Sequence, residues 1–184
     1  MENSILIGGF GGQGVMIFGQ LLSYTAAETT DKYVTYFPSY SIEKRGGTAN
    51  CYVTISDEPI GAPKAEMTDY VVALNNLAMN KFVNNIYPGG TMFINSSVCT
   101  DKPNRSDITF IEVPADDVAR EIGDNRVTNL CMIGAFIAYT DMLPPEKVLA
   151  TAFKKLGAKR PELNALNEAA FRKGMEIGKA AKAK

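Results

Sequence analysis

The chain has 184 residues, of which 46% are hydrophobic and 21% charged, and its formal net charge at pH 7 is −1. This composition is that of an ordinary globular protein, and the nearly balanced charge excludes a global attraction to nucleic acid or to an anionic membrane. A chain of this length is most simply one domain, so we expect residues 1–184 to form a single domain.

The first half of the chain predicts strands joined by few helices. An apolar run at residues 4–8 predicts a buried strand, and the segment after it predicts a helix over 13–29. The apolar stripe of that helix consists of Val15, Phe18, Leu22 and Ala26. Further strands are predicted at 32–37, 51–56, 69–75, 91–97 and 108–113, with a short helix at 77–87 that ends at Pro88-Gly89-Gly90.

From residue 115 onward the sequence is mostly helical. Helices are predicted at 116–122, 127–142, 145–157 and 161–182, with Pro145 and Pro161 in first turns. The segment 127–140 carries no charge, which predicts a helix buried on every side, within its own domain or against another chain. The apolar stripe of the last helix consists of Leu163, Leu166, Ala170, Ile177 and Ala181.

Strands that are apolar on both faces and alternate with helices predict an α/β fold. We expect a Rossmann-like open sheet of about six mostly parallel strands, with flanking helices and a helical C-terminal third. No helix separates the second, third and fourth strands, so at least one of them is expected to be antiparallel or at an edge.

Histidine is absent, and the three cysteines, Cys51, Cys99 and Cys131, lie far apart and form no CxxC pair. The commonest general base and metal ligand is therefore missing. The cysteine spacing argues against a disulfide framework, a zinc site and a cysteine-ligated iron–sulfur cluster. We expect no catalytic residue and no metal site in this chain.

The N-terminal sequence has no basic segment ahead of its short apolar run, so we expect no signal peptide. The uncharged segment 127–140 has fourteen residues, which is too short to cross a bilayer. We therefore expect a cytoplasmic protein without a membrane partner.

A glycine-rich segment between the first strand and the first helix satisfies the pattern G-x-G-x-x-G. Its candidate cofactor-binding residues are Gly9, Gly11, Gly12, Gln13 and Gly14. Glycines allow close backbone approach, and the first N–H groups of a helix attract an anion. Two interpretations stay open: a contact with a phosphate, or a tight turn that lets the strand and the helix pack closely.

A conventional NAD site needs an acidic residue at the end of the second strand, where it binds the ribose hydroxyls. That strand instead runs into Phe37, Pro38 and Ser39, while Glu28 and Asp31 precede it. The sequence therefore disfavours NAD.

The segment 38–50 has no helical periodicity, and loops of this length are usually functional or interfacial. Arg45 could bind a phosphate or a partner's carboxylate through its fork of donors. The candidate binding residues here are Ser39, Tyr40, Arg45, Gly46 and Gly47. Ligand loops in open α/β sheets leave the carboxyl ends of strands, so both glycine-containing loops could meet at one crevice. The alternative is an ordinary surface loop.

These two segments together resemble the gamma subunits of 2-oxoacid:ferredoxin oxidoreductases. The similarity lies in GGFGGQGV and YFPSYSIEKRGGTANCYVTISDEPIGAP, and it continues through DYVVALNNLAMNKF, PGGTMFINSS, NLCMIGAF and PELNALNEAAFRKG. The sequence of the second segment is most similar to the 2-oxoglutarate branch, although Ile42 and Lys44 stand where Pro and Met are expected. Pyruvate, branched-chain 2-oxoacid and indolepyruvate enzymes carry related subunits.

The resemblance implies a subunit of a complex that oxidatively decarboxylates a 2-oxoacid, forms an acyl-CoA and reduces ferredoxin. Thiamine diphosphate and the iron–sulfur clusters are then carried by partners: an alpha subunit, a thiamine-binding beta subunit and often a ferredoxin-like delta subunit. This chain would assemble the complex, and its two loops are suited to the phosphates of CoA. Two alternatives stay open: a free-standing Rossmann-like nucleotide-binding oxidoreductase, and a purely architectural subunit.

Overall fold

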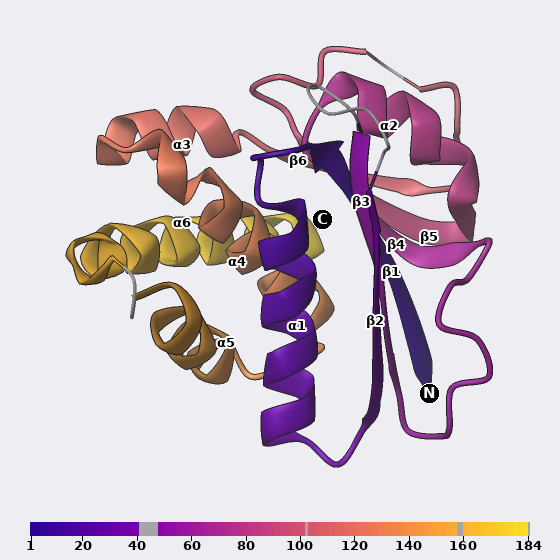
Figure 1. Ribbon diagram of the computed structural model, residues 1–184. Helices are drawn as coiled ribbons and strands as arrows, with labels where there is room; N and C mark the ends of the chain where they lie inside the picture. The colour runs from indigo at the N-terminus through magenta and orange to yellow at the C-terminus, as the bar shows by residue number, and fades with distance from the viewer. Residues whose placement is uncertain (41–47, 102, 158–159, 184) are drawn as a thin grey trace. The chain divides into compact units, whose positions relative to one another are not determined.

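The computed structural model describes residues 1–40, 48–101, 103–157 and 160–183 (Figure 1). They form two compact units. We name them the sheet unit, Met1–Ile94 with Val98–Glu112, and the helical unit, Asn95–Ser97 with Val113–Lys184. That residues 1–184 act as one domain stays a prediction.

The described residues of the sheet unit build a six-stranded sheet with the order β2-β3-β1-β4-β5-β6. The strands are β1 (Glu2–Phe10), β2 (Tyr33–Tyr40), β3 (Thr48–Ser56), β4 (Thr68–Ala73), β5 (Ile86–Asn95) and β6 (Thr109–Val113). β1 pairs in parallel with β4, and β4 with β5, whereas β3 pairs antiparallel with both β1 and β2. β1 and β2 therefore run in the same direction and β3 is reversed, which confirms the expected mostly parallel sheet with an antiparallel strand and an edge strand.

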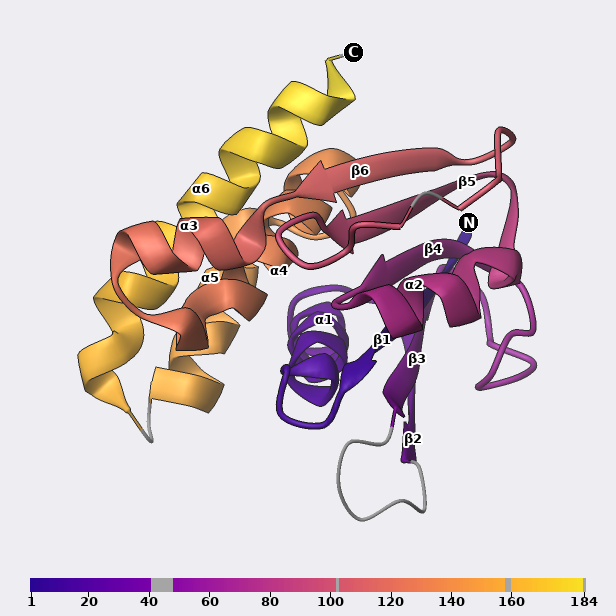
Figure 2. The same cartoon turned by 90° about the horizontal axis from the view of Figure 1, so that it is seen from above.

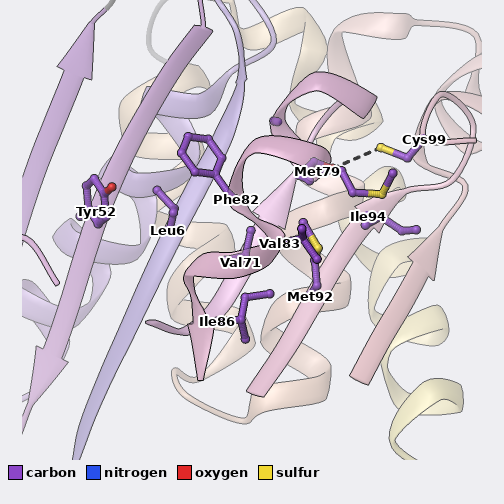
Figure 3. Close-up of a cluster of buried hydrophobic side chains, with 12 residues drawn as sticks. Leu6, Tyr52, Val71, Met79, Phe82, Val83, Ile86, Met92, Ile94 and Cys99 are labelled. Atoms are coloured by element: carbon purple, nitrogen blue, oxygen red, sulfur yellow. Dashed lines mark hydrogen bonds between the residues drawn. The ribbon is translucent and has the colours of Figure 1, made fainter. Parts of the chain in front are cut away.

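Two helices of this unit, α1 (Val15–Thr29) and α2 (Asn76–Phe82), cover opposite faces of the sheet (Figures 1 and 2). The predicted stripe of α1 is confirmed, because all four of its residues are at most 2% exposed. On the other face, a buried cluster joins α2 to the sheet (Figure 3). Met79 and Phe82 of α2 pack there with Leu6 and Tyr52 of the strands. Alternation along the strands thus supplies both faces with apolar side chains.

The loop predicted at 38–50 is shorter in the structure, because both flanking strands extend into it. Ser39 pairs with Asn50, and Tyr40 with Ala49. Pro38 lies within β2, where it is tolerated because β2 is an edge strand. The segment 41–47 lies outside the described residues.

The predicted helix at 77–87 is also shorter. α2 ends at Phe82, a 3₁₀ turn follows at Val83–Asn85, and β5 begins at Ile86. Pro88-Gly89-Gly90 therefore lies inside a strand, at a register shift in the pairing of β4 with β5. Gly89 has a φ of 83°, which a glycine adopts without strain, so the segment forms an irregular strand start rather than a helix stop.

The helical unit contains α3 (Ala115–Ile122), α4 (Thr128–Thr140), α5 (Pro145–Ala152) and α6 (Asn164–Lys182). As predicted, α4 is buried nearly all round, with every residue from Asn129 to Ala138 buried. Pro145 and Pro161 lie in first turns, also as predicted. None of the helices in the described part of the chain is long and apolar enough to cross a bilayer.

Backbone contact between α4 and α6 depends on three glycines. A Cβ built on Gly174 would lie 1.9 Å from the carbonyl oxygen of Cys131, and one on Gly178 would lie 2.2 Å from that of Ala135. A Cβ on Gly134 would lie 2.1 Å from the carbonyl oxygen of Phe171. The buried face of α6 thus contains two glycines, together with Phe171 and Met175, that the predicted stripe did not include.

Candidate functional site

The two candidate loops start at neighbouring positions, on the edge of the sheet that is formed by the carboxyl ends of β1 and β2. Phe10, the last residue of β1, pairs with Thr48, and Tyr40, the last residue of β2, pairs with Ala49. The glycine segment and the described residues on either side of 41–47 therefore meet at the edge where β1 and β2 end. This is where open α/β sheets place ligands.

The glycine segment forms a tight turn between β1 and α1. The Gln13 N–H donates to the Phe10 carbonyl over 3.2 Å, which makes Gly11 and Gly12 the central residues of a β-turn. Gly12 has a φ of 94°, as the second central residue of a type II turn requires, and the N-cap Gly14 has a φ of 84°. Gly12 and Gly14 are thus required by the backbone itself.

Gln13 stabilises the turn with its side chain. Its Oε1 accepts hydrogen bonds from the Phe10 N–H and from Nδ2 of Asn75, both at 2.7 Å. Its Nε2 donates to the Leu74 carbonyl over 3.3 Å. The amide is therefore occupied by the protein, so Gln13 acts on the loop's shape. Whether it also contacts a ligand stays a prediction.

The remaining glycines differ in their surroundings. A Cβ on Gly9 would lie 2.9 Å from Oε1 of Gln13 and 2.9 Å from Val15, so this residue is small for packing. Gly11 is exposed, and a Cβ there would meet no atom within 4 Å. Neither strain nor packing within the described residues requires a glycine at position 11, which leaves its backbone open to an approaching molecule.

The first turn of α1 faces the same edge and carries no acidic residue of its own. Its N-cap is a glycine, which has no side chain to cap the helix. The first N–H groups of a helix have no acceptor within the helix, and with the helix dipole they make such a terminus favourable for a phosphate.

Of the second loop's candidates, Ser39 is half-buried on β2 opposite Asn50, and Tyr40 is the last residue of that strand. Arg45, Gly46 and Gly47 lie outside the described residues. Their proposed role in binding stays a prediction.

Sequence reasoning missed two residues at this edge, Asn75 and Lys81. Asn75 follows β4, is 7% exposed and caps α2 by accepting a hydrogen bond from the Ala78 N–H at 2.8 Å. Lys81 of α2 is exposed, and its Nζ donates to Oγ1 of Thr48 over 3.2 Å. An N-cap pattern could have indicated Asn75, but only the β1–β3 register brings Thr48, and with it Lys81, beside the end of β1.

Two of the three cysteines, Cys51 and Cys131, are poor nucleophiles because they are buried. Burial raises the pKa of Cys51 to about 12, and its Sγ donates to the Val15 carbonyl over 3.4 Å. Burial also raises the pKa of Cys131 to about 12. Both side chains therefore remain thiols at neutral pH.

Within the described residues, no group of three or more acidic or cysteine side chains could hold a metal ion. What the edge offers instead is backbone N–H groups, a helix N-terminus and the ammonium group of Lys81. Such groups bind and orient an anion.

Comparison with known proteins places this geometry in a class. The family model described as "Pyruvate ferredoxin/flavodoxin oxidoreductase" matches residues 4–177. The 2-oxoglutarate synthase subunit KorC of Methanocaldococcus jannaschii is 34% identical over 181 residues, which cover 97% of this chain and 95% of that subunit. The keto/oxoacid ferredoxin oxidoreductase gamma subunit of Geobacter sulfurreducens superposes with a TM-score of 0.86 at 25% identity, over 98% of both chains.

A longer chain contains the same fold. The structure of the 2-oxoglutarate:ferredoxin oxidoreductase from Magnetococcus marinus, with 2-oxoglutarate, coenzyme A and succinyl-CoA bound, matches with a TM-score of 0.88 at 24% identity. The match covers 97% of this chain and 31% of that one, so it shows the shared fold.

The fold, the glycine turn and these matches define a gamma-type subunit of an oxidoreductase. The chain belongs to the pyruvate ferredoxin/flavodoxin oxidoreductase family.

Proposed function

We propose that this chain is the gamma subunit of a 2-oxoglutarate:ferredoxin oxidoreductase. The complex oxidatively decarboxylates 2-oxoglutarate, transfers the acyl group to CoA and passes the electrons to ferredoxin. The observation that carries this proposal is the 34% identity to a 2-oxoglutarate synthase subunit over nearly the full length of both chains.

The substrate is tested by a panel of 2-oxoacids on the complex purified from its native source. We expect 2-oxoglutarate to give the highest kcat/KM among 2-oxoglutarate, pyruvate, 3-methyl-2-oxobutanoate and indolepyruvate. A preference for another member of the panel would move the chain to a different branch of the family.

The partners follow from the missing reaction chemistry in this chain. We infer that alpha and beta subunits supply the thiamine diphosphate site, and that other subunits, including a ferredoxin-like delta subunit, carry the iron–sulfur clusters. The absence of histidine and the two thiols with pKa values near 12 support this division. Native purification from the cytoplasm, with identification of the co-eluting chains, tests it; elution of the chain alone would contradict it.

Within the complex, we propose that the glycine loop contacts the phosphates of CoA. The site comprises Gly9, Gly11, Gly12, Gln13 and Gly14, together with Ser39, Tyr40, Arg45, Gly46 and Gly47 of the neighbouring loop. The open space around Gly11 and the start of α1, which has a glycine at the N-cap and no acidic residue in its first turn, support this role. CoA suits the site because its pyrophosphate and 3′-phosphate are anions that helix N-termini and lysine attract.

Gly11→Leu tests the contact, because a Cβ at this position meets no described atom within 4 Å, whereas a larger side chain would obstruct a closely approaching ligand. We expect the KM for CoA to rise on the order of tenfold, which corresponds to about 1.4 kcal/mol. Gly61→Leu is the matched control, because Gly61 is equally exposed and open. An unchanged KM for CoA in the Gly11 variant would remove the contact.

Arg45→Ala and Lys81→Ala test the cationic part of the site. Each should raise the KM for CoA a few-fold, more at low salt than at high salt, because the attraction is screened by ions. Lys64→Ala is the control, since Lys64 lies instead over the Tyr52 ring, 5.4 Å from its centroid.

A purely architectural role is the second candidate, because the Gln13 amide is occupied by protein groups. It predicts that CoA leaves hydrogen exchange of residues 9–15 and 38–50 unchanged in the complex. Protection of these residues by CoA would contradict it.

A further inference from the structure

Asn75 is a buried polar residue that connects the start of α2 to the glycine loop by hydrogen bonds. We propose that Asn75 is a positioning residue: through Gln13, it holds the loop in the shape that accepts CoA. The inference rests on the proposed contact of the loop with CoA, and the glycine motif itself does not include Asn75.

The hydrogen bonds of Asn75 fix the orientation of its amide. Oδ1 can only accept, and it faces the Ala78 N–H at 2.8 Å, while Nδ2 can only donate, and it faces Oε1 of Gln13 at 2.7 Å. The side chain is 7% exposed, so water does not compete freely for either end. One amide thus joins the start of α2 to the glycine turn.

The orientation of the Gln13 amide is fixed in the same way. Oε1 also accepts from the Phe10 N–H, and Nε2 donates to the Leu74 carbonyl. The Phe10 N–H and the Leu74 carbonyl therefore require the same orientation of the Gln13 amide as Asn75 does. We call this set of hydrogen bonds, from Ala78 through Asn75 and Gln13 to Phe10 and Leu74, the amide latch.

The latch determines which backbone groups remain for a ligand. The N–H groups of Phe10 and Gln13 are both bound inside the turn. The N–H groups of Gly11 and Gly12 make no hydrogen bond to any residue that the structure describes. The latch therefore holds the ends of the turn and presents its middle, the same part in which Gly11 leaves open space.

An aspartate at position 75 separates the two tasks of Asn75. Aspartate caps a helix as well as asparagine does, so α2 keeps its N-cap. It has no donor for Gln13, and its carboxylate would lie against Oε1, which repels it. The helix start should then survive while the turn loosens.

The experiment measures kinetics of the reconstituted complex with Asn75→Asp. We expect the KM for CoA to rise about three- to tenfold, as the loss of one hydrogen bond predicts. The KM for the 2-oxoacid and kcat at saturating CoA should stay unchanged, a split that general destabilisation would not produce. Asn84→Asp is the matched control, because Asn84 is an exposed asparagine just beyond α2.

A double-mutant cycle with Gln13→Ala tests whether Asn75 acts through Gln13. If it does, the double variant should have the KM for CoA of Gln13→Ala alone. Additive effects would overturn the latch.

The failure of this proposal can be distinguished from the failure of the proposed function. If Gly11→Leu raises the KM for CoA and Asn75→Asp does not, the positioning role is wrong and the CoA contact stands. If neither variant changes it, both are wrong. If Asn75→Asp raises both KM values alike, or prevents assembly, Asn75 is only structural and the proposal is also overturned.

Discussion

Glycines serve opposite purposes in the two units of this protein. In the sheet unit, Gly11 and Gly12 form an exposed turn with open space around them. In the helical unit, Gly134, Gly174 and Gly178 are buried, and each would place a Cβ against a backbone carbonyl. The comparison teaches that a glycine motif has to be judged by its surroundings. Close packing accounts for the second group, whereas no strain or contact among the residues that the structure describes accounts for Gly11.

The largest change in stability is expected when the close contact between α4 and α6 is disrupted. Gly174→Val should lower the free energy of unfolding by about 3 kcal/mol or more, because the carbonyl of Cys131 belongs to a backbone that cannot move aside cheaply. Urea denaturation measures this change. Ala180→Val, at an exposed position of α6, should change the free energy by less than about 1 kcal/mol; an equal loss in both would show that the glycine contact is not special.

A smaller change in stability is expected within the glycine turn, where Gly12 and Gly11 can be compared directly. Gly12→Ala should cost about 1–3 kcal/mol, since its φ of 94° is unfavourable for any residue with a Cβ. Gly11→Ala should stay within about 0.5 kcal/mol, because it meets neither strain nor contact. Thermal and urea unfolding of both variants measure the difference. Comparable losses would mean that Gly11 is also required by the fold.

The smallest change is expected in the acid stability of the helical unit, through the carboxylate of Asp124. Hydrogen bonds from the Arg126 guanidinium, with Nε 2.9 Å from Oδ1, lower the pKa of Asp124 to about 2. Because the folded pKa lies below the unfolded value of about 3.9, this carboxylate stabilises the fold above pH 4, and the contribution disappears as the pH falls toward 2.

Asp124→Asn should therefore unfold with a flatter pH dependence between pH 4 and pH 2 than the parent chain. Chemical denaturation at a series of pH values measures the slope. Asp31→Asn, at an exposed position of the sheet unit, serves as the control; an identical slope for the Asp124 variant and the parent would show that the ion pair with Arg126 is not coupled to folding.

Local patterns predicted the elements and much of their burial. The spacing of Val15, Phe18, Leu22 and Ala26 identified the buried face of α1, and the uncharged run identified α4 as a buried helix. The lack of a helix between the second, third and fourth strands predicted that at least one of them is antiparallel or at an edge, and the structure shows that β3 is the reversed strand. These features follow from the periodicity of side chains along a single element.

Element ends were less predictable. Pro88-Gly89-Gly90 was expected to end a helix, and it lies in β5, because pairing with β4 and a register shift override the local preference. The 38–50 loop lost residues at both ends to the β2–β3 ladder for the same reason. On α6, the predicted stripe missed Gly174 and Gly178, since a glycine has no apolar side chain to count. It also missed Phe171 and Met175, because the close contact with α4 decides which face of α6 is buried.

The sequence by itself determined the class of fold, the turn at Gly9–Gly14, the lack of histidine and the likeness to the gamma subunits, because these depend on residue type and short-range spacing. Only the tertiary structure decided that Gln13 is bound by Asn75 and that Lys81 reaches Thr48. It also decided that a side chain at Gly11 would meet neither strain nor an atom of the described residues. The physical reason is that these facts depend on strand register and helix placement, which join residues more than sixty positions apart for Gln13 and Asn75.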